Sequence, residues 1–271
     1  LVVGAQLYDA GGQTNAGGVW TWRYNGSTYS YVGARTNPRG NASHTYWSGS
    51  STARGMCMAS NGLNMVVSQQ NYNSSRGIVD VYSRAAITDN WTYYGTISNS
   101  IHTHTTQYFG ASLDISSDGK VVVIGAYLVE NTVYREGAAY VYEYTGSADG
   151  IYSGGSWAHR NTLLSSSPQS EGYFGRSVAI SQDANYILVG EPRTPASGSD
   201  IYTGAVYSYV RSGNSWGFQS MLVDPDAVAR LNMGDHAALR LSSDGTYALV
   251  GVRLSDDDDD ESVGKVLYFK R

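Results

Sequence analysis

The stretch FGASLDISSDGKVVVIGAYLVENTVYREGAAYVYEY, residues 109–144, decides the fold. Its first part, FGASLDIS (109–116), alternates apolar and polar residues, and KVVVIGAY (120–127) is a run rich in β-branched residues. An Asp-Gly pair in the segment between them favours a tight turn. The aromatic run AAYVYEY (138–144) follows a longer, more polar loop. Period-2 alternation, β-branched enrichment and glycine-containing turns predict three antiparallel strands here.

Imperfect copies of this stretch recur along the whole chain. A strand that ends in small residues occurs five times, as LVVGA, NMVVSQ, VVVIGA, YILVGE and YALVGV. A glycine that opens an aromatic strand also occurs five times, as GVWTWRY, GIVDVYS, GAAYVYEY, GAVYSYV and GKVLYFK. Short turns such as SDG precede the first type of strand, and an outer strand, usually led by tryptophan, follows the second. The copies predict a repeat of about 60 residues with four strands, here called A to D.

The fold class predicted from these copies is all-β, a β-propeller of four-stranded blades. Five repeats are visible in the order BCD, ABCD, ABCD, ABCD, ABC, so the first lacks strand A and the last lacks strand D. Stacking of blade on blade explains why the C strands are apolar on both faces. A β-solenoid is the structural competitor, although its repeats are usually shorter.

The domain expected is one β-propeller over residues 1–271, and we interpret it as a fragment of a longer polypeptide. The basis for this is that the chain begins at Leu1, directly inside a strand-like run. Two ways of closing the ring stay open. Five blades could close with one further segment, or residues beyond either end could supply a sixth or seventh blade.

The third and fourth copies resemble FG-GAP repeats, the blades of integrin-like propellers. Both copies have an aromatic-Gly pair, Phe109-Gly110 and Phe174-Gly175. In both, the motifs S-[LV]-x-I-S, V-[IV]-G-[AE] and G-A-[AV]-Y follow in this order, with leucine in place of the first valine of the second motif in the fourth copy. The second copy has Thr52-Ala53 where Phe-Gly is expected, and the fifth has Asp235-His236, which marks these copies as degenerate. The resemblance implies a propeller of the type without calcium loops, because a short SDG turn replaces the acidic D-x-D-x-D-G loop. No cofactor is therefore expected, and Ca²⁺ is not implied.

Composition limits the function further. The formal net charge is −5 at pH 7 and only 15% of residues are charged, which argues against a nucleic-acid partner because such proteins need a basic face. The single cysteine, Cys57, has no partner for an internal disulfide. No apolar run is long enough for a membrane helix, so no membrane insertion is expected.

The predicted binding surface is the face of the propeller that carries the B–C loops and the D–A segments, here called the long-loop face. The B–C loops differ in length and sequence, and long variable loops on a rigid scaffold are common sites of binding. Five tyrosines of these loops are the candidate binding residues, since an aromatic ring can stack on a sugar or anchor a protein partner: Tyr8, Tyr72, Tyr127, Tyr134 and Tyr202. Blade-to-blade packing is the alternative role for each of them.

Two places have residues that suit a metal ion. Asp256, Asp258 and Asp260 belong to the only dense charge run, and carboxylates suit hard cations, although a solvated acidic loop is the alternative interpretation. His102 and His104 would point to the same side of an extended segment.

No nucleophile elbow, phosphate-binding glycine loop, HExxH or CxxC pair is present, so the chain is not expected to be an enzyme. The leading hypothesis is a non-enzymatic propeller module of a large extracellular or virion surface protein, similar to an adhesin or tail fibre. It would contact other protein subunits or recognise a cell-surface glycan or receptor. A purely architectural subunit of a surface filament and a polysaccharide lyase or glycosidase are the alternatives.

Overall fold

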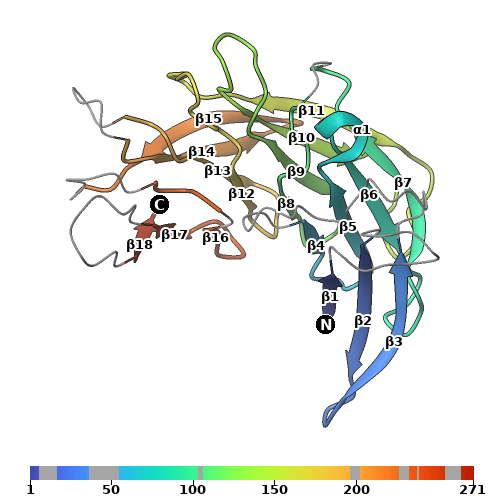
Figure 1. Cartoon of the computed structure of the whole chain (residues 1–271). Coiled ribbons are helices and arrows are strands. Elements are labelled where there is room, and N and C mark those ends of the chain that lie inside the picture. Colours follow the sequence, from blue (N-terminus) through green and yellow to red (C-terminus); the bar gives the residue numbers. More distant parts are fainter. Residues whose placement is uncertain are drawn as a thin grey trace.

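The structure is a computed structural model, and it describes residues 1–5, 17–36, 55–102, 106–195, 202–225, 232–236, 238–253 and 264–271. The described residues form five antiparallel sheets, three with four strands and two with three. Figure 1 shows these sheets fanned out in an arc, with the N-terminus and the C-terminus near its two ends. We call the sheets blades one to five in chain order. The chain therefore folds as a β-propeller with five visible blades, as predicted.

The strand order BCD, ABCD, ABCD, ABCD, ABC is confirmed strand by strand. Blade one comprises β1 (Val2–Ala5), β2 (Gly18–Tyr24) and β3 (Tyr29–Thr36). Blade two comprises β4 (Met56–Met58), β5 (Asn64–Gln69), β6 (Ile78–Ser83) and β7 (Thr92–Ser98), with the single turn α1 (Tyr72–Ser75) in its B–C loop. Blade three comprises β8 (Ser112–Ile115), β9 (Val121–Ala126), β10 (Ala138–Tyr144) and β11 (Trp157–Leu163). Blade four comprises β12 (Ser177–Ile180), β13 (Tyr186–Glu191), β14 (Ala205–Ser212) and β15 (Ser215–Leu222). Blade five comprises β16 (Leu239–Leu241), β17 (Tyr247–Val252) and β18 (Lys265–Lys270).

The A strands line the concave side of the arc and the D strands its convex side (Figure 1). Neighbouring A strands contact one another across the blade boundaries, β4 with β8, β8 with β12, and β12 with β16. Blades one and five stand apart at the two ends of the arc in the same view. Among the described residues, the five sheets therefore do not close into a ring.

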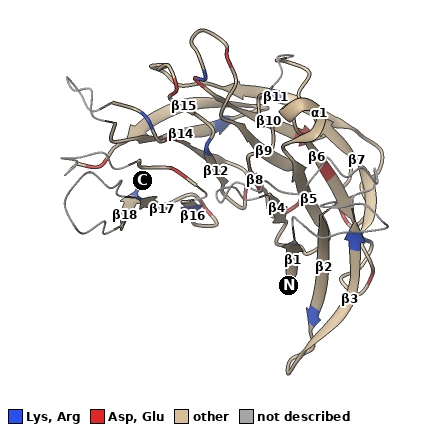
Figure 2. Cartoon of the chain, viewed as in Figure 1, with Lys and Arg blue, Asp and Glu red and all other residues tan. Residues whose placement is uncertain are grey.

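The apolar cores lie between blades. Four clusters of buried side chains are present, and each one joins residues of two successive blades. In β9, for example, Val122 and Ile124 pack toward blade two, whereas Val121 and Val123 pack toward blade four. This alternation explains why a central strand can be apolar at every position and still be fully buried. The charged residues are sparse on these strands, as Figure 2 shows.

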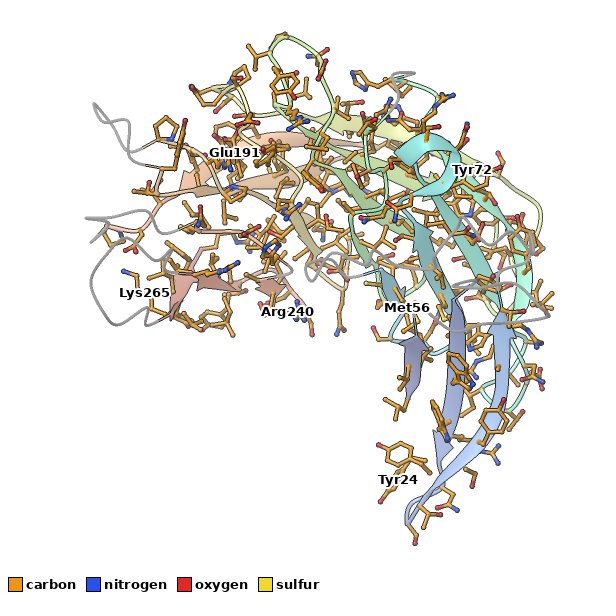
Figure 3. All side chains as sticks on the ribbon, viewed as in Figure 1. Tyr24, Met56, Tyr72, Glu191, Arg240 and Lys265 are labelled. Atoms are coloured by element: carbon orange, nitrogen blue, oxygen red, sulfur yellow. The ribbon has the colours of Figure 1, made fainter. Side chains whose placement is uncertain are left out.

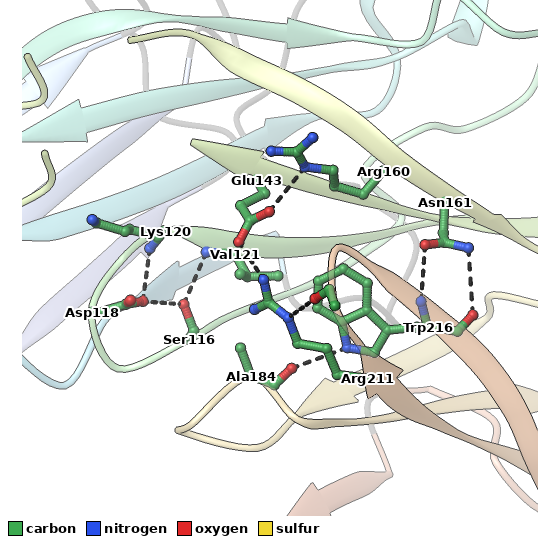
Figure 4. A network of polar contacts seen from close by, with 11 residues as sticks. Ser116, Asp118, Lys120, Val121, Glu143, Arg160, Asn161, Ala184, Arg211 and Trp216 are labelled. Carbon is green, nitrogen blue, oxygen red and sulfur yellow. Dashed lines mark hydrogen bonds and ion pairs between the residues drawn. The ribbon is translucent and has the colours of Figure 1, made fainter. Parts of the chain in front are cut away.

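The predicted polar turns between strands A and B share one hydrogen-bond pattern, and Figure 4 shows it for the turn of blade three. In blade three, the Ser116 hydroxyl donates to Asp118 Oδ1 over 2.6 Å, and the Lys120 amide donates to the same oxygen over 3.0 Å. Equivalent contacts hold the turns of blades four and five, at Asp183 and Asp244. The turn aspartates therefore act as local acceptors of hydrogen bonds.

A glycine before each C strand explains the second repeated feature of the sequence. Gly77, Gly137 and Gly204 have φ between +75° and +84°, a conformation that a side chain disfavours. A Cβ at Gly137 would also lie 2.1 Å from the carbonyl oxygen of Phe174 in the next blade. In blade one the register of strand pairing assigns this place to Gly17 (φ +72°), one residue before the glycine that the sequence pattern indicated.

Candidate ligand-binding site on the long-loop face

The starts of the A strands β8, β12 and β16 are fixed by a short backbone motif. Tyr108, Tyr173 and Asn232 have positive φ, and each is followed by a fully buried residue and then by a glycine with positive φ. The buried residues are Phe109, Phe174 and Met233. Isolated bridges join Gly137 to Phe174 and Gly204 to Met233, so each motif is attached to the start of the preceding blade's C strand. The motif thus places the D–A segment of one blade beside the B–C loop of the blade before it.

This geometry corrects the assignment of the fifth copy. Met233-Gly234, and not Asp235-His236, is the counterpart of Phe174-Gly175, because Met233 makes the equivalent bridge and Ser177 donates a hydrogen bond to the Gly234 carbonyl as Ser112 does to that of Gly175. By the register of strand pairing, Ala238 takes the place of Ser177, so blade five has two additional residues between this motif and that position. The sequence pattern assumed the same spacing in every copy, so it placed the pair two residues too late. Thr52-Ala53, the pair in the second copy, lies outside the described residues.

Three arginines from blades three and four gather at a pocket on the long-loop face. Arg135 comes from the B–C loop of blade three, Arg176 directly follows Gly175, and Arg193 lies in the B–C loop of blade four. The pocket has a volume of about 410 Å³, and Tyr127, Tyr173, Asn232 and Asp235 also contribute to its lining. Its wall therefore combines guanidinium groups with aromatic rings and only a little aliphatic surface.

Two carboxylates hold the arginines in place. Glu171 Oε2 accepts from Arg193 Nη1 over 2.9 Å, and Glu171 Oε1 lies 3.4 Å from Arg135 Nη1. Arg176 Nε donates to Asp235 Oδ1 over 3.1 Å. The side chains of Arg135 and Arg193 are 37% and 41% exposed, so solvent reaches these guanidinium groups. Three guanidinium charges against two carboxylates leave one net positive charge at the pocket.

Aromatic rings support each guanidinium. Arg176 lies 4.2 Å from the ring centre of Tyr127, Arg193 lies 4.7 Å from that of Tyr173, and Arg135 lies 4.6 Å from that of Tyr134. Such cation–π contacts orient the guanidinium plane and contribute about 0.5–1 kcal/mol at exposed positions. Burial raises the pKa of Tyr127 above its ordinary value, although Arg176 opposes that shift. Tyr127 is therefore a neutral hydrogen-bonding ring at physiological pH.

Buried glutamates anchor the two loops that carry Arg135 and Arg193. Glu136 accepts hydrogen bonds from the amide and the hydroxyl of Thr132, which fold the loop back on itself. Glu191, labelled in Figure 3, accepts from Thr194, Ser165 and Tyr207 at distances of 2.7–3.1 Å. Both glutamates are fully or nearly fully buried. The arginines therefore project from loops with fixed bases, which lowers the cost of ordering them for a ligand.

His236 lies at the edge of this site and contributes little charge. Its Nε2 is 3.1 Å from Asp235 Oδ2. Burial lowers its pKa below the ordinary value, an effect that exceeds the opposing attraction of Asp235. His236 is thus neutral at pH 7, and Asp235 remains the acceptor that positions Arg176.

The predicted tyrosines have different surroundings. Tyr127 lines the arginine pocket, where it stacks on Tyr108 with ring centres 5.6 Å apart, and Tyr134 lies 49% exposed beneath Arg135. Tyr72 lies on α1 (Figure 3) and lines a separate pocket with Asn73 and Gln107. Tyr202 pairs with Pro195 in an isolated bridge and is not a lining residue of the arginine pocket. Tyr8 lies outside the described residues.

The candidate metal residues find no support among the described residues. Asp256, Asp258 and Asp260 lie outside them, as does His104. His102 Nδ1 lies 2.6 Å from the hydroxyl of Tyr140. In the part of the chain that the structure describes, no group of three or more His, Cys, Asp or Glu residues could hold a metal ion.

Sequence reasoning missed the arginines. Each of the three occurs at a loop position with no arginine at the same place in the other copies, so aligning the repeats gave no signal. The tyrosines drew attention because they are frequent in loops, whereas the contacts of Arg176 with Tyr127 and of Arg193 with Tyr173 cross from one loop to another. The site becomes visible only in the folded structure, where loops from blades three to five lie side by side.

Two segments of this chain match the family described as FG-GAP repeat, residues 103–142 and residues 157–209. These segments carry FG-GAP repeats. They contain both Phe-Gly pairs, the A and B strands and most of the C strand of blades three and four, and all three arginines of the pocket. The predicted resemblance is therefore confirmed, and the FG-GAP repeats supply a large part of the candidate site.

One solved structure supports the fold. A protein from Lactobacillus plantarum has 15% identity and a TM-score of 0.52, with 93% of this chain and 63% of that chain covered. A hypothetical selenium-binding protein from Sulfolobus tokodaii (8% identity, TM-score 0.46, 89% and 56% covered) and a putative 6-phosphogluconolactonase from Bacteroides fragilis (13% identity, TM-score 0.44, 99% and 77% covered) are also similar. This chain spans less than two thirds of the Lactobacillus plantarum protein. No protein of curated function matches the chain in sequence.

Among the described residues, no helix is both long enough and apolar enough to span a membrane.

Proposed function

We propose that this chain is a non-enzymatic binding module of a large extracellular or virion surface protein, in which it recognises a cell-surface glycan or receptor through the long-loop face. The observation that carries the proposal is the arginine pocket, where loops from three blades assemble guanidinium groups on aromatic supports. Polar groups held in fixed positions at a concave site give a bound ligand its orientation and specificity. The rigid blades beneath these loops hold the pocket in one arrangement.

A glycan or the polar surface of a receptor suits this pocket better than an apolar ligand. Saccharides present many hydroxyl groups that accept hydrogen bonds from guanidinium and tyrosine donors. Their ring faces pack against aromatic side chains, which combine apolar area with a polar tip. Both carboxylates of the pocket are engaged in ion pairs with arginine, which favours a binding role for them over acid–base catalysis.

A glycan array probed with the purified 271-residue chain tests the proposal. We expect binding to a subset of glycans, and we expect Arg193→Ala to weaken it by about tenfold, the effect of losing one charge-assisted hydrogen bond. Arg271→Ala is the matched control, because Arg271 also lies over a tyrosine ring, at 3.9 Å from Tyr186, but directly follows strand β18 and lies outside the arginine pocket.

Two outcomes would contradict this function. Failure of the wild-type chain to bind any glycan or any cell would remove the ligand-binding role and favour an architectural module. Cleavage of a bound polysaccharide, seen as new reducing ends or unsaturated products, would replace the binding module with an enzyme.

A further inference from the structure

We infer that the arginine pocket is a subsite for the carboxylate of an acidic saccharide, an inference that rests on the proposed binding function. The chain as a whole is acidic, with a net charge of −5, yet this pocket has more guanidinium groups than carboxylates. A local excess of positive charge favours the binding of anionic ligands over neutral and cationic ones.

The pocket already shows that it can hold a carboxylate. Glu171 extends one oxygen to Arg193 and the other to Arg135, so the two guanidinium groups stand at a spacing that matches a single carboxylate. A guanidinium presents five N–H donors in a planar fork, and each ion pair with Glu171 uses only one nitrogen of each arginine. The side chains of Arg135, Arg193 and Glu171 are all between 37% and 41% exposed. A carboxylate from solvent can therefore bind beside Glu171 or displace it.

The rest of the pocket suits a sugar ring. The volume of about 410 Å³ is in the lower part of the range typical of small-ligand sites, about 300–1,000 Å³. Asn232 and the hydroxyls of Tyr127 and Tyr173 supply neutral hydrogen-bonding groups around the arginines. A large apolar ligand would form no hydrogen bonds with this polar lining. A pyranose ring that carries one carboxylate satisfies both the charge and the polar lining.

Two matched pairs of probes separate the carboxylate from the rest of the sugar. An oligogalacturonate is compared with its methyl ester, and sialyllactose is compared with lactose, by calorimetric titration at low and at high salt. We expect at least one acid to bind about tenfold or more tightly than its neutral partner. We expect the difference to shrink at high salt, because salt screens partly exposed charges. The pair that responds distinguishes a uronate from a sialic acid.

Variants then tie this preference to the pocket. Arg135→Ala and Arg193→Ala should each abolish most of the difference between acid and neutral probe, whereas Arg271→Ala should leave it unchanged. Glu171→Gln should act in the opposite direction and strengthen binding of the acid, since it removes the internal carboxylate that competes for the same guanidinium groups. Equal melting temperatures of the variants exclude unfolding as the cause.

Several results would overturn the inference. Equal affinity for the acid and neutral members of both pairs would do so, and would leave the proposed function intact if glycans still bind. Binding of array glycans without any binding of these four probes would have the same meaning. If Glu171→Gln bound the acid more weakly than the wild type, Glu171 would be a contact of the ligand and not its competitor. That result would contradict the carboxylate subsite.

Discussion

Blades three and five contain similar B strands in different surroundings. The strand β9 reads VVVIGA and all six of its residues are buried, whereas in the strand β17, YALVGV, Tyr247 and Leu249 are 39% and 46% exposed. The same contrast holds for the C strands, because β10 is almost fully buried and β18 alternates between half-buried and exposed residues. A blade therefore buries its second face only when another blade covers it. Each repeat encodes apolar residues on both faces of its strands, but these residues stabilise the fold only where a neighbouring blade buries them.

The largest effect is expected where an aromatic residue fills such an interface. Phe174 is fully buried between blades three and four, and its ring lies 5.3 Å from that of Tyr207. We expect Phe174→Ala to lower the free energy of unfolding by about 3–5 kcal/mol, because a cavity remains in a packed core. Phe218 of blade four, on the outer strand β15, is 51% exposed, and Phe218→Ala should cost less than about 1 kcal/mol. Equal losses in urea unfolding would show that the interfaces do not dominate stability.

A smaller effect is expected at the second-last position of the B strands, which is a glycine in every blade except blade two. A Cβ at Gly190 would lie 2.1 Å from the carbonyl oxygen of Gly234 in blade five, so the backbones of two blades must move apart. We expect Gly190→Ala to cost about 1–3 kcal/mol, the usual price of overpacking. At Gly251 in blade five, the nearest atom is the Ala238 side chain at 2.9 Å, within the same blade. Gly251→Ala should therefore lower the melting temperature less than Gly190→Ala does, and the reverse order would contradict this account of the interface.

The sequence was sufficient to predict the blades because each blade is a local unit. The order of strands, the polar turns and the glycines before C strands all depend on contacts within about 60 residues, so a pattern in the chain reports them directly. The two errors have local causes as well. A two-residue insertion before β16 concealed the counterpart of Phe-Gly at Met233-Gly234, and consecutive glycines at 17 and 18 concealed a shift of one residue.

The candidate site could be predicted only in part. The long-loop face and Tyr127 followed from loop lengths and aromatic residues. The pairing of Arg193 with Glu171, or of Arg176 with Asp235, joins residues that are 22 and 59 positions apart in loops of different blades. No repeat requires those pairs, since each loop has its own sequence. A residue pattern can therefore locate the face, but not the charges that meet on it.

A third prediction concerns two acids with opposite pKa shifts. Burial raises the pKa of Glu191 in blade four, and one of its oxygens is buried without a hydrogen-bond partner. Hydrogen bonds from Thr246 and Ser242 lower the pKa of the exposed Asp244 in blade five to about 2. A raised carboxyl pKa stabilises the fold at low pH, and this stabilisation is lost as pH rises through the folded-state pKa. A lowered one stabilises the fold above the unfolded pKa, and this stabilisation is lost as pH falls toward 2.

Glu191→Gln should therefore flatten the loss of stability as pH rises above 4.5, the ordinary pKa of a glutamate, because a buried glutamine stays neutral at every pH and a buried carboxylate does not. Asp244→Asn should change stability only in the acidic range, where it removes part of the slope between pH 4 and about pH 2. Urea unfolding across pH 2–9 measures both. An unchanged slope above pH 5 in Glu191→Gln would show that another buried group is responsible.

The last prediction tests the uncovered face directly. The pairing of strands makes Tyr268 in blade five the counterpart of Val141 in blade three, because Leu249 pairs with Tyr268 as Val123 pairs with Val141. Val141 is fully buried against blade four, whereas Tyr268 is 61% exposed. Threonine keeps the β-branched shape that strands prefer but adds a hydroxyl. Val141→Thr should lower the free energy of unfolding by about 1–3 kcal/mol, because it buries an unpaired hydroxyl. Tyr268→Thr should change the free energy of unfolding by less than about 0.5 kcal/mol. If both substitutions cost the same, the outer face of blade five is covered in solution, and the contrast between inner and terminal blades would disappear.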